Sequence, residues 1–372
     1  MEGFAACFSG LEDPREDNAR HDLHAPLMIA FCALLCGAED CSDMAVFGRA
    51  KEPFLRRFLP LRRGVPSHDT FSRVFRLLDP ARFEACFVRF MERFADAARG
   101  VVAVDGKTLR RSYDRAAGAS PLHLVSAWAC GARLVLGQVA VEKGSNEIAA
   151  VPELLALLSL RGATVTADAM NCQRAVAERV VAQGGDHVLA LKGNQGTLRD
   201  DVGLHLDDPE HAPKLAHARE VDGGHGRVET REASVCADVG WLRERHAWPG
   251  LAAVGKVERT REAGGETGRE TAYFLLSAAL PPGRFAEVVR AHWGIENGLH
   301  RVLDVTMGED RSRGRKGNGP RNLALLRRLA LNAMALEGSK GSNKGKFKRA
   351  GWDDAFLARL LTAAGGSQAP RP

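Results

Sequence analysis

The order of apolar segments between residues 101 and 194 is the feature that most constrains the fold of this chain. Three short segments with the alternating pattern of strands come first, at 101–107, 122–129 and 133–142. Helical and strand-like patterns then alternate, with helices expected at 146–160 and 171–183 and strands at 162–170 and 187–194. A meander followed by alternating helices and strands predicts an α/β fold in which a mixed sheet is flanked by helices.

Two of the expected strands end in an acidic residue. Asp105 closes the first strand, and Asp168 closes the fourth. If these strands are neighbours, the two carboxylates lie close together and repel each other unless a cation lies between them. Magnesium prefers such hard oxygen ligands. A strand-end Asp is also a common helix cap, so each residue alone leaves both interpretations open.

A third carboxylate lies on an expected helix near residue 296. The residues that share one face of this helix at three- and four-residue steps are Phe285, Val289, Trp293, Glu296, His300 and Leu303. The spacing therefore predicts that Glu296 and Trp293 point inward. A buried carboxylate is costly unless it is paired or bound to a metal. Gly294 and Gly298 flank Glu296 and predict that another part of the chain approaches this helix closely.

Positive charge is concentrated after this helix. Between Arg311 and Arg349 the chain has twelve Lys or Arg residues and one acidic residue, Glu337. Such a block favours a polyanionic partner, most simply nucleic acid, although a solvated basic surface fits it equally well. The residues expected to contact a DNA backbone are Arg311, Arg313, Arg315 and Lys316.

Changes of pattern divide the chain into five parts. We expect a helical N-terminal domain (1–97), the first part of the α/β core (98–207), a β-rich insertion (208–280), the C-terminal helices of the core (281–337) and a basic linker with a short helix (338–372). Within these, 320–337 reads as an amphipathic helix and 338–349 as a flexible linker. The basic residues of the first part suit either a DNA-binding domain or a plain helical bundle.

Several classes of protein are disfavoured by composition. No apolar run reaches the length of a membrane span, and the acidic start of the chain is unlike a signal peptide. The eight cysteines lack the spacing of a disulfide framework or a zinc knuckle. These features predict a cytoplasmic protein with reduced thiols and no membrane partner.

Six segments in a fixed order carry a resemblance to a known family. They are VAVDGKTLRRS, TADAMNCQ, LALKGNQ, HGRVETR, HWGIENGLHRVLDV and GEDRSR. In this order they resemble the ISAs-one family of insertion-sequence transposases, also called H-repeat-associated proteins, and GVPSHDTFSRVF resembles the amino-terminal associated domain of that family. The resemblance covers roughly residues 20 to 340.

This resemblance implies an RNase H-like fold and a D-D-E triad, placed on Asp105, Asp168 and Glu296. It implies two Mg²⁺ or Mn²⁺ ions, binding of the terminal inverted repeats, cleavage at the 3′ ends and strand transfer into target DNA. Because two ends are brought together, a homodimer is expected in the DNA complex. A nuclease that never joins DNA and a domesticated DNA-binding protein are the alternatives.

Further site residues are expected around the triad. Those expected to contact DNA, besides the basic loop, are Lys107, Lys192, Asn194, His225, Arg227 and Arg301. His300 and Asp304 are expected to support the metal ligands, although His300 also suits a packed core position. Relatives of the family often have an Arg before this Glu and a Lys after it, and His292 and Asp304 stand near those places here.

Overall fold

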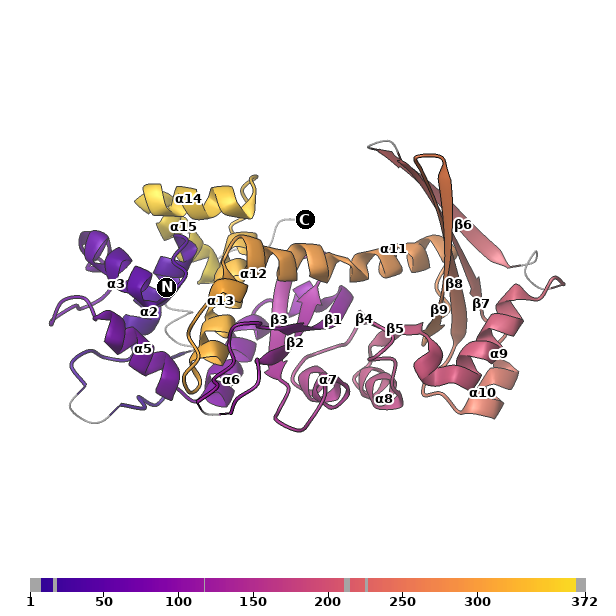
Figure 1. Ribbon diagram of the computed structural model, residues 1–372, viewed down its shortest axis with the longest axis horizontal. Helices are drawn as coiled ribbons and strands as arrows, with labels where there is room; N and C mark the ends of the chain where they lie inside the picture. The colour runs from indigo at the N-terminus through magenta and orange to yellow at the C-terminus, as the bar shows by residue number, and fades with distance from the viewer. Residues whose placement is uncertain (1–7, 16–18, 117, 211–214, 225–226, 366–372) are drawn as a thin grey trace.

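One nine-stranded sheet runs through the molecule. The computed structural model describes the chain except for residues 1–7, 16–18, 117, 211–214, 225–226 and 366–372. The strands are β1 (Gly100–Thr108), β2 (His123–Ala129), β3 (Leu134–Ala140), β4 (Ala163–Ala167), β5 (Asp186–Leu191), β6 (Ala216–Gly224), β7 (Arg227–Cys236), β8 (Ala253–Ala263) and β9 (Glu266–Leu276). Their order in the sheet is β3-β2-β1-β4-β5-β9-β8-β7-β6. Figure 1 shows helices at one end of an elongated molecule and β6 to β9 at the other.

The first five strands confirm the predicted mixed sheet. β1 pairs with β2 and β2 with β3 in antiparallel fashion, whereas β1 pairs with β4 and β4 with β5 in parallel. This is the five-stranded order of an RNase H-like sheet. The helices α7 (Glu147–Ala156) and α8 (Arg174–Ala182) occupy the predicted positions between strands, and the Asn146 side chain caps α7 by accepting from the Ala149 N–H.

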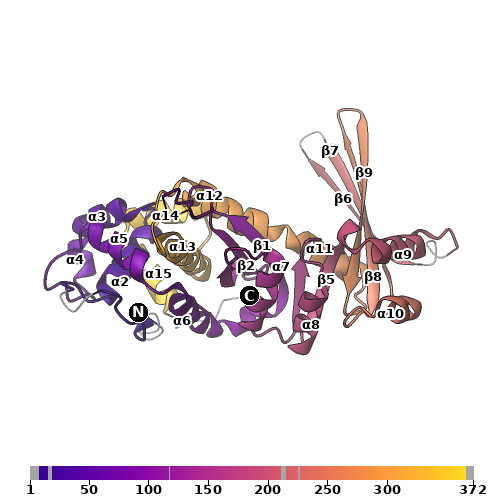
Figure 2. The same cartoon turned by 60° about the horizontal axis from the view of Figure 1, so that its bottom comes forward.

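The β-rich segment extends this same sheet. β6, β7, β8 and β9 form successive antiparallel pairs, and β9 then pairs with β5 over Val188↔Leu276 to Leu191↔Tyr273. It was predicted as an insertion, and its strands are present, but they share backbone hydrogen bonds with the core. In β8, Ala253 to Lys256 are buried, and beyond Val257 the strand becomes largely exposed. We call β6 to β9 the arm, and Figure 2 shows the strand tips projecting away from the rest of the molecule.

Two short helices stand beside the arm, and six helical segments form the N-terminal part. The former are α9 (Gly196–Asp207) and α10 (Gly240–His246). The latter are α2 (His24–Leu35), α3 (Cys41–Ala50), α4 (Glu52–Leu55), α5 (His68–Leu77), α6 (Pro80–Glu92) and the 3₁₀ turn Ala95–Ala98. The predicted helical character of this part is confirmed, and Ser67 caps α5 by accepting from the Thr70 N–H.

The helix α13 (Gly319–Leu336) is the centre of the molecule. It was predicted to be amphipathic, and that prediction is wrong, because its buried residues include almost every position from Asn322 to Met334. The reason is that α2, α5, α6 and α15 pack on it from one side and β3 from another. One continuous core therefore joins the N-terminal helices to the sheet.

The C-terminal residues fold more than expected. The segment predicted as a flexible linker contains α14 (Asn343–Trp352), which Ser342 caps, and buried Phe347 anchors it to the core. The short final helix is confirmed as α15 (Asp354–Ala364). In the part of the chain that the structure describes, no helix is long and apolar enough to cross a membrane.

Candidate active site

The two aspartates lie next to each other where the pairing of β1 with β4 stops. Asp168 directly follows β4, as predicted, but Asp105 lies within β1, which continues to Thr108, so the prediction that Asp105 ends its strand is wrong. β1 and β4 are parallel neighbours, and the last registered pair between them is Val104↔Ala167. Asp105 and Asp168 are the next residues of the two strands, so both carboxylates stand at the same edge of the sheet. Both residues are partly buried.

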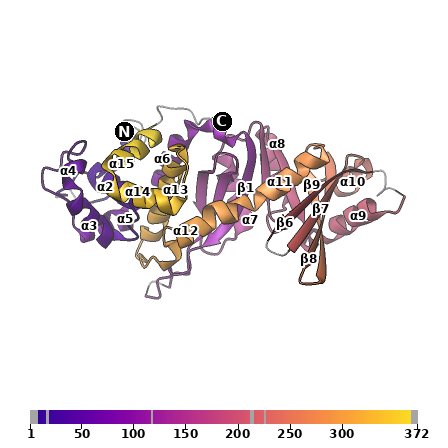
Figure 3. The ribbon, with the colours of Figure 1, turned by 90° about the horizontal axis from the view of Figure 1, so that it is seen from above.

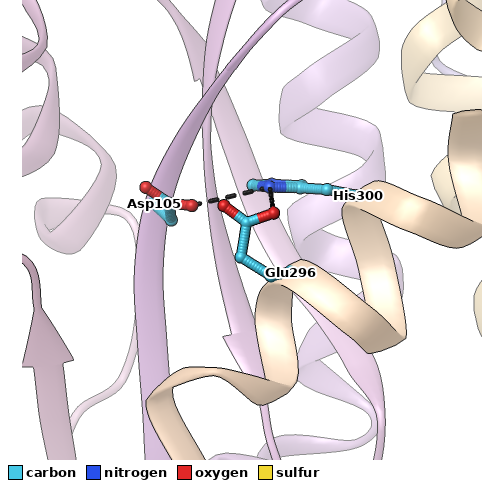
Figure 4. Close-up of side chains that lie close together, drawn as sticks. All are labelled: Asp105, Glu296 and His300. Carbon is cyan, nitrogen blue, oxygen red and sulfur yellow. Dashed lines mark ion pairs between the residues drawn. The ribbon is translucent and has the colours of Figure 1, made fainter. Parts of the chain in front are cut away.

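A long helical segment brings Glu296 and His300 to this edge. It consists of α11 (Pro282–His292), the π-helical turn Glu296–His300 and α12 (Arg301–Val305), and it crosses the sheet in Figure 3. The His300 Nδ1 atom lies 3.5 Å from Asp105 Oδ2 and 3.6 Å from Glu296 Oε2. Figure 4 shows these three side chains pointing toward one another, and their ligand atoms all lie within 4.8 Å of one another. Asp168 stands outside this close group.

The helix presents a different face from the predicted one. The Glu296 side chain is 55% exposed, and Trp293 is 61% exposed and not part of the core. Ile295 and Leu299 are buried in their place, whereas Phe285, His300 and Leu303 are buried as predicted. The prediction assumed regular α-helical spacing, whereas a π turn takes in more residues and rotates the positions on either side of it.

One of the two glycines marks a close approach, as predicted. A Cβ on Gly298 would lie 3.1 Å from Trp128 Cζ2, so the glycine lets the helix pack on β2. A Cβ on Gly294 would meet nothing within 4 Å.

The electrostatics of the site favour a cation. Burial, together with the nearby charges of Glu296, Glu147 and Asp168, raises the pKa of Asp105 to about 7, although the Gly106 N–H opposes the shift. Burial and the cations of Arg328 and Lys107 lower the pKa of His300 to about 4.

At neutral pH the His300 imidazole is therefore uncharged, and its Nδ1 lone pair can act as a ligand. The carboxylate oxygens and this nitrogen are donors that suit Mg²⁺ or Mn²⁺, and a divalent cation would offset the repulsion between the acids.

One buried acid of the site was missed from the sequence. The Glu147 Oε2 atom lies 2.8 Å from His123 Nε2, and Glu147 Oε1 accepts from Asn171 Nδ2 at 2.6 Å. Asn171 also donates to Asp168 Oδ1. The sequence does show an acidic residue, Glu147, at the first position of the helix that follows β3. The prediction of helix caps considered only the preceding residue, Asn146.

Lys107 is a buried member of an ion-pair network. Its Nζ atom lies 2.8 Å from Asp304 Oδ1, 3.2 Å from Asp310 Oδ1 and 3.5 Å from Glu309 Oε2. Its side chain is only 7% exposed. The ammonium therefore faces three carboxylates of its own chain, which favours a structural role over the expected phosphate contact. Asp304 contacts Lys107, and its expected supporting role at the site stays a prediction.

The loop after β5 adjoins the Asp168 loop. The Asn194 Nδ2 atom donates to the Ala169 carbonyl at 2.6 Å, while Lys192 is exposed. Arg227 opens β7 at the tip of the arm, where it pairs with Gly224 and Ala263. His225 lies outside the described residues.

The basic residues after the site differ in their partners. Arg311 forms an ion pair of 2.6 Å with Glu39. The Arg315 guanidinium lies 4.4 Å from the Tyr113 ring centroid and donates to the Arg111 carbonyl. The remaining exposed residues of the expected DNA-contacting set near the site are Arg301, Arg313 and Lys316.

The chain is similar to known proteins over most of its length. The family model described as "Transposase DDE domain" matches residues 96–333, and the model "DDE_Tnp_1-associated" matches residues 5–91. The "Uncharacterized protein in dhlA 3'region" of Xanthobacter autotrophicus is 44% identical over 74% of this chain and 94% of its own length. The "H repeat-associated putative transposase YhhI" of Escherichia coli (strain K12) is 35% identical over 93% of both chains.

A solved piggyBac transposase synaptic complex with hairpin DNA aligns with a TM-score of 0.41 at 12% identity, covering 96% of this chain and 77% of that chain.

Proposed function

Because this chain belongs to the family of transposases with a DDE domain, we propose that it moves an insertion sequence. It binds the terminal inverted repeats, cleaves the DNA at the 3′ ends of the element and joins each freed 3′-hydroxyl to target DNA. The observation that supports this most directly is the meeting of Asp105, Glu296 and His300 at the edge of the sheet where β4 also delivers Asp168.

The acidic residues would hold two divalent ions. We assign Asp105, Asp168 and Glu296 as metal ligands, with His300 Nδ1 as a further donor. When bound, such ions activate the attacking water or 3′-hydroxyl and stabilise the leaving oxygen of a phosphodiester. The partly buried Asp105 holds its carboxylate in place from the sheet, while the half-exposed Glu296 lies on the side from which DNA can approach.

Exposed basic residues would position the DNA. Lys192 follows β5 beside the Asp168 loop, Arg301 follows Glu296 on the same helical segment, and Arg313 and Lys316 lie in the next loop. Contacts from such residues to phosphates position a duplex without reading its sequence. Since two ends of the element must be held together, we propose a homodimer in the DNA complex.

The test separates metal binding from DNA binding. Asp105→Asn, Asp168→Asn and Glu296→Gln should each abolish cleavage of a labelled end duplex in Mn²⁺ while leaving affinity for that duplex within a few-fold of wild type. Glu153→Gln, which changes an exposed acid on α7, is the matched control. Near wild-type cleavage by one of the three variants would remove that residue from the site.

A second assay distinguishes transposition from simpler activities. A pre-cleaved end duplex is incubated with a supercoiled target plasmid, and joined product is measured. Joined product supports the transposase. Cleavage without joining identifies a nuclease, and binding of end DNA without either reaction identifies a domesticated binding protein.

A further inference from the structure

A hydrogen-bonded group that is largely buried contacts Asp168. It contains His123 from β2, Glu147 from the first turn of α7 and Asn171 from the loop after β4. Asn171 is fully buried and Glu147 is 7% exposed, so water cannot substitute readily for the bonds between them. We call these three residues the support group.

The hydrogen bonds of the support group connect His123 to Asp168 through Glu147 and Asn171. Each oxygen of Glu147 has its own partner: Oε2 lies 2.8 Å from His123 Nε2, and Oε1 accepts from Asn171 Nδ2 at 2.6 Å. The same Asn171 Nδ2 atom donates to Asp168 Oδ1 at 3.0 Å, and the Asn171 backbone N–H donates to that oxygen at 3.0 Å. Glu147 thus fixes the orientation of the amide that holds Asp168.

The orientation of the Asn171 amide determines whether its side chain can hold Asp168. Asn171 meets Asp168 and Glu147 with the same nitrogen, so a rotation of its side chain loses both contacts at once. Both bonds to Asp168 end on Oδ1, which leaves Oδ2 as the freer atom to face a cation. Hydrogen bonds of this kind fix the direction of a ligating carboxylate.

The first catalytic strand is also shaped around Glu147. A Cβ on Gly106, the residue after Asp105, would lie 2.1 Å from Glu147 Oε2 and 2.5 Å from His123 Nε2. Cβ atoms do not approach other atoms so closely, so a glycine at this position admits the Glu147 carboxylate. The strand carrying Asp105 and the loop carrying Asp168 therefore both meet at the same buried acid.

Glu147 holds its partners as an anion. Burial alone would raise its pKa, but hydrogen bonds from His123 and Asn171 outweigh burial, and the net pKa is lowered. An ionised acceptor makes the bond from Asn171 stronger than a neutral acceptor would. The Thr108 hydroxyl, 2.7 Å from His123 Nδ1, extends the group to the end of β1.

We propose that Glu147 is a positioning residue that orients Asp168 through Asn171 for binding of the divalent cation. The proposal rests on the proposed function in one respect, namely that Asp168 is a metal ligand. Glu147 itself does not touch the metal in this account, because both of its oxygens already have partners within the protein.

A double-mutant cycle tests this chain of contacts without relying on activity. The variants are Glu147→Gln, Asn171→Ala and the two combined, and the readout is the Mn²⁺ dissociation constant measured by calorimetry on the full chain without DNA. Each single variant should weaken Mn²⁺ binding about 10- to 100-fold. The double variant should bind no more weakly than Asn171→Ala alone, because Glu147 acts only through Asn171.

Two outcomes would overturn the proposal. If the two losses multiply in the double variant, Glu147 acts on the metal independently of Asn171. If Mn²⁺ affinity is unchanged while the melting temperature of the metal-free protein falls, the support group is merely structural. Glu153→Gln on the same helix is the control and should change neither quantity.

A milder variant is needed if substitution of the buried residues Glu147 and Asn171 impairs folding. Thr108→Val removes the hydroxyl beside His123 at an exposed position, and it should weaken Mn²⁺ binding by a few-fold with little loss of stability. Unchanged affinity in this folded variant would count against the proposal. DNA cleavage by the wild type is measured separately, so that failure of the proposed function is distinguished from failure of the positioning role.

Discussion

Two groups of charged residues border His300, and they are built in opposite ways. In the first, three cations lie among three carboxylates, so each buried charge has an opposite charge beside it; the cations are Lys107, Arg110 and Arg328, and the acids are Asp304, Glu309 and Asp310. The Arg328–Glu309 pair, with 3.0 Å between Nη1 and Oε1, is fully buried. We call this the neutralised group.

The second group is an excess of acids. Asp105, Asp168, Glu147 and Glu296 converge at this edge of the sheet, where Asp105 and Glu296 pair with His300 and Glu147 pairs with His123. The low pKa of His300 means that this residue brings no positive charge at neutral pH.

The difference separates structure from function. A cluster that neutralises itself holds the chain together, whereas a cluster of acids without cations is unfavourable until a metal binds. The neutralised group is also joined to the acidic group through the backbone. Lys107 lies two residues after Asp105 on β1, and its partner Asp304 lies one turn after His300.

The largest expected effect comes from breaking the neutralised group. Glu309→Gln leaves the buried Arg328 without its counter-charge and should lower the free energy of unfolding by about 3–5 kcal/mol. Urea unfolding in the presence of a chelator measures it. In the same assay Asp105→Asn should leave stability unchanged or raise it, since it relieves repulsion. A loss for Asp105→Asn equal to that for Glu309→Gln would erase the distinction between the groups.

Adding metal should act on the acidic group alone. Wild-type protein should gain about 2.7 kcal/mol of stability at a Mn²⁺ concentration of 100 times the dissociation constant. Glu296→Gln should gain clearly less, whereas Glu262→Gln, at an exposed position of the arm, should match wild type. Melting curves with chelator and with Mn²⁺ provide the comparison. Equal shifts for wild type and Glu296→Gln would exclude Glu296 as a ligand.

A steric change at Gly106 should produce a smaller loss that can be repaired. Gly106→Ala places a methyl group against the Glu147 carboxylate and should cost about 1–3 kcal/mol through overpacking. Glu147→Ala removes the group that the methyl meets, so the double variant should recover part of the difference between Gly106→Ala and wild type. Thermal unfolding of the four proteins measures the recovery. Strictly additive losses would show that the two positions do not compete for space.

The smallest expected effect concerns the basic loop at residues 311–316. Arg311 and Arg315 contact other residues of the protein, whereas Arg313 and Lys316 are exposed. Arg313→Ala and Lys316→Ala should each reduce the slope of log K against log salt for duplex DNA by about 0.9. Arg311 is held by Glu39 and Arg315 by Tyr113, so their replacement should change the slope less. DNA titrations at several salt concentrations measure the slopes. A larger change at Arg311 than at Arg313 would show that the ion pair opens for DNA.

The sequence predicted those strands and helix caps that depend on interactions between residues close together in the chain. The five core strands follow from alternation, and the caps Ser67 and Asn146 from their side-chain oxygens. The placement of Asp168 at the end of a strand was likewise predicted. Asp105 lies within β1 rather than at its end, but it is adjacent to Asp168 because β1 and β4 are parallel neighbours.

The errors concern residues whose environment is supplied by distant parts of the chain. Burial of α13 depends on helices that lie hundreds of residues earlier, and the burial of Lys107 depends on acids near residue 309. The exposure of Glu296 follows from the π turn, which no spacing rule indicates. Glu147 was missed because its partner Asn171 lies on a different element, so neither residue stands out alone.

The sheet is narrowest at β5, and this has a mechanical consequence. β8 and β9 are joined over eleven residue pairs, whereas β4 and β5, and again β5 and β9, are joined over four pairs each. A force applied at the tip of the arm is therefore transmitted along the long β8–β9 pair to the short pairings that β5 makes with β4 and β9. We call these two short pairings the waist. That waist adjoins Asp168 at the end of β4 and Lys192 at the end of β5. Anything that grips the arm thus loads the strands next to the proposed metal site, and it also loads α11, which packs on β6 and β7 of the arm and on β1 and β4 of the core.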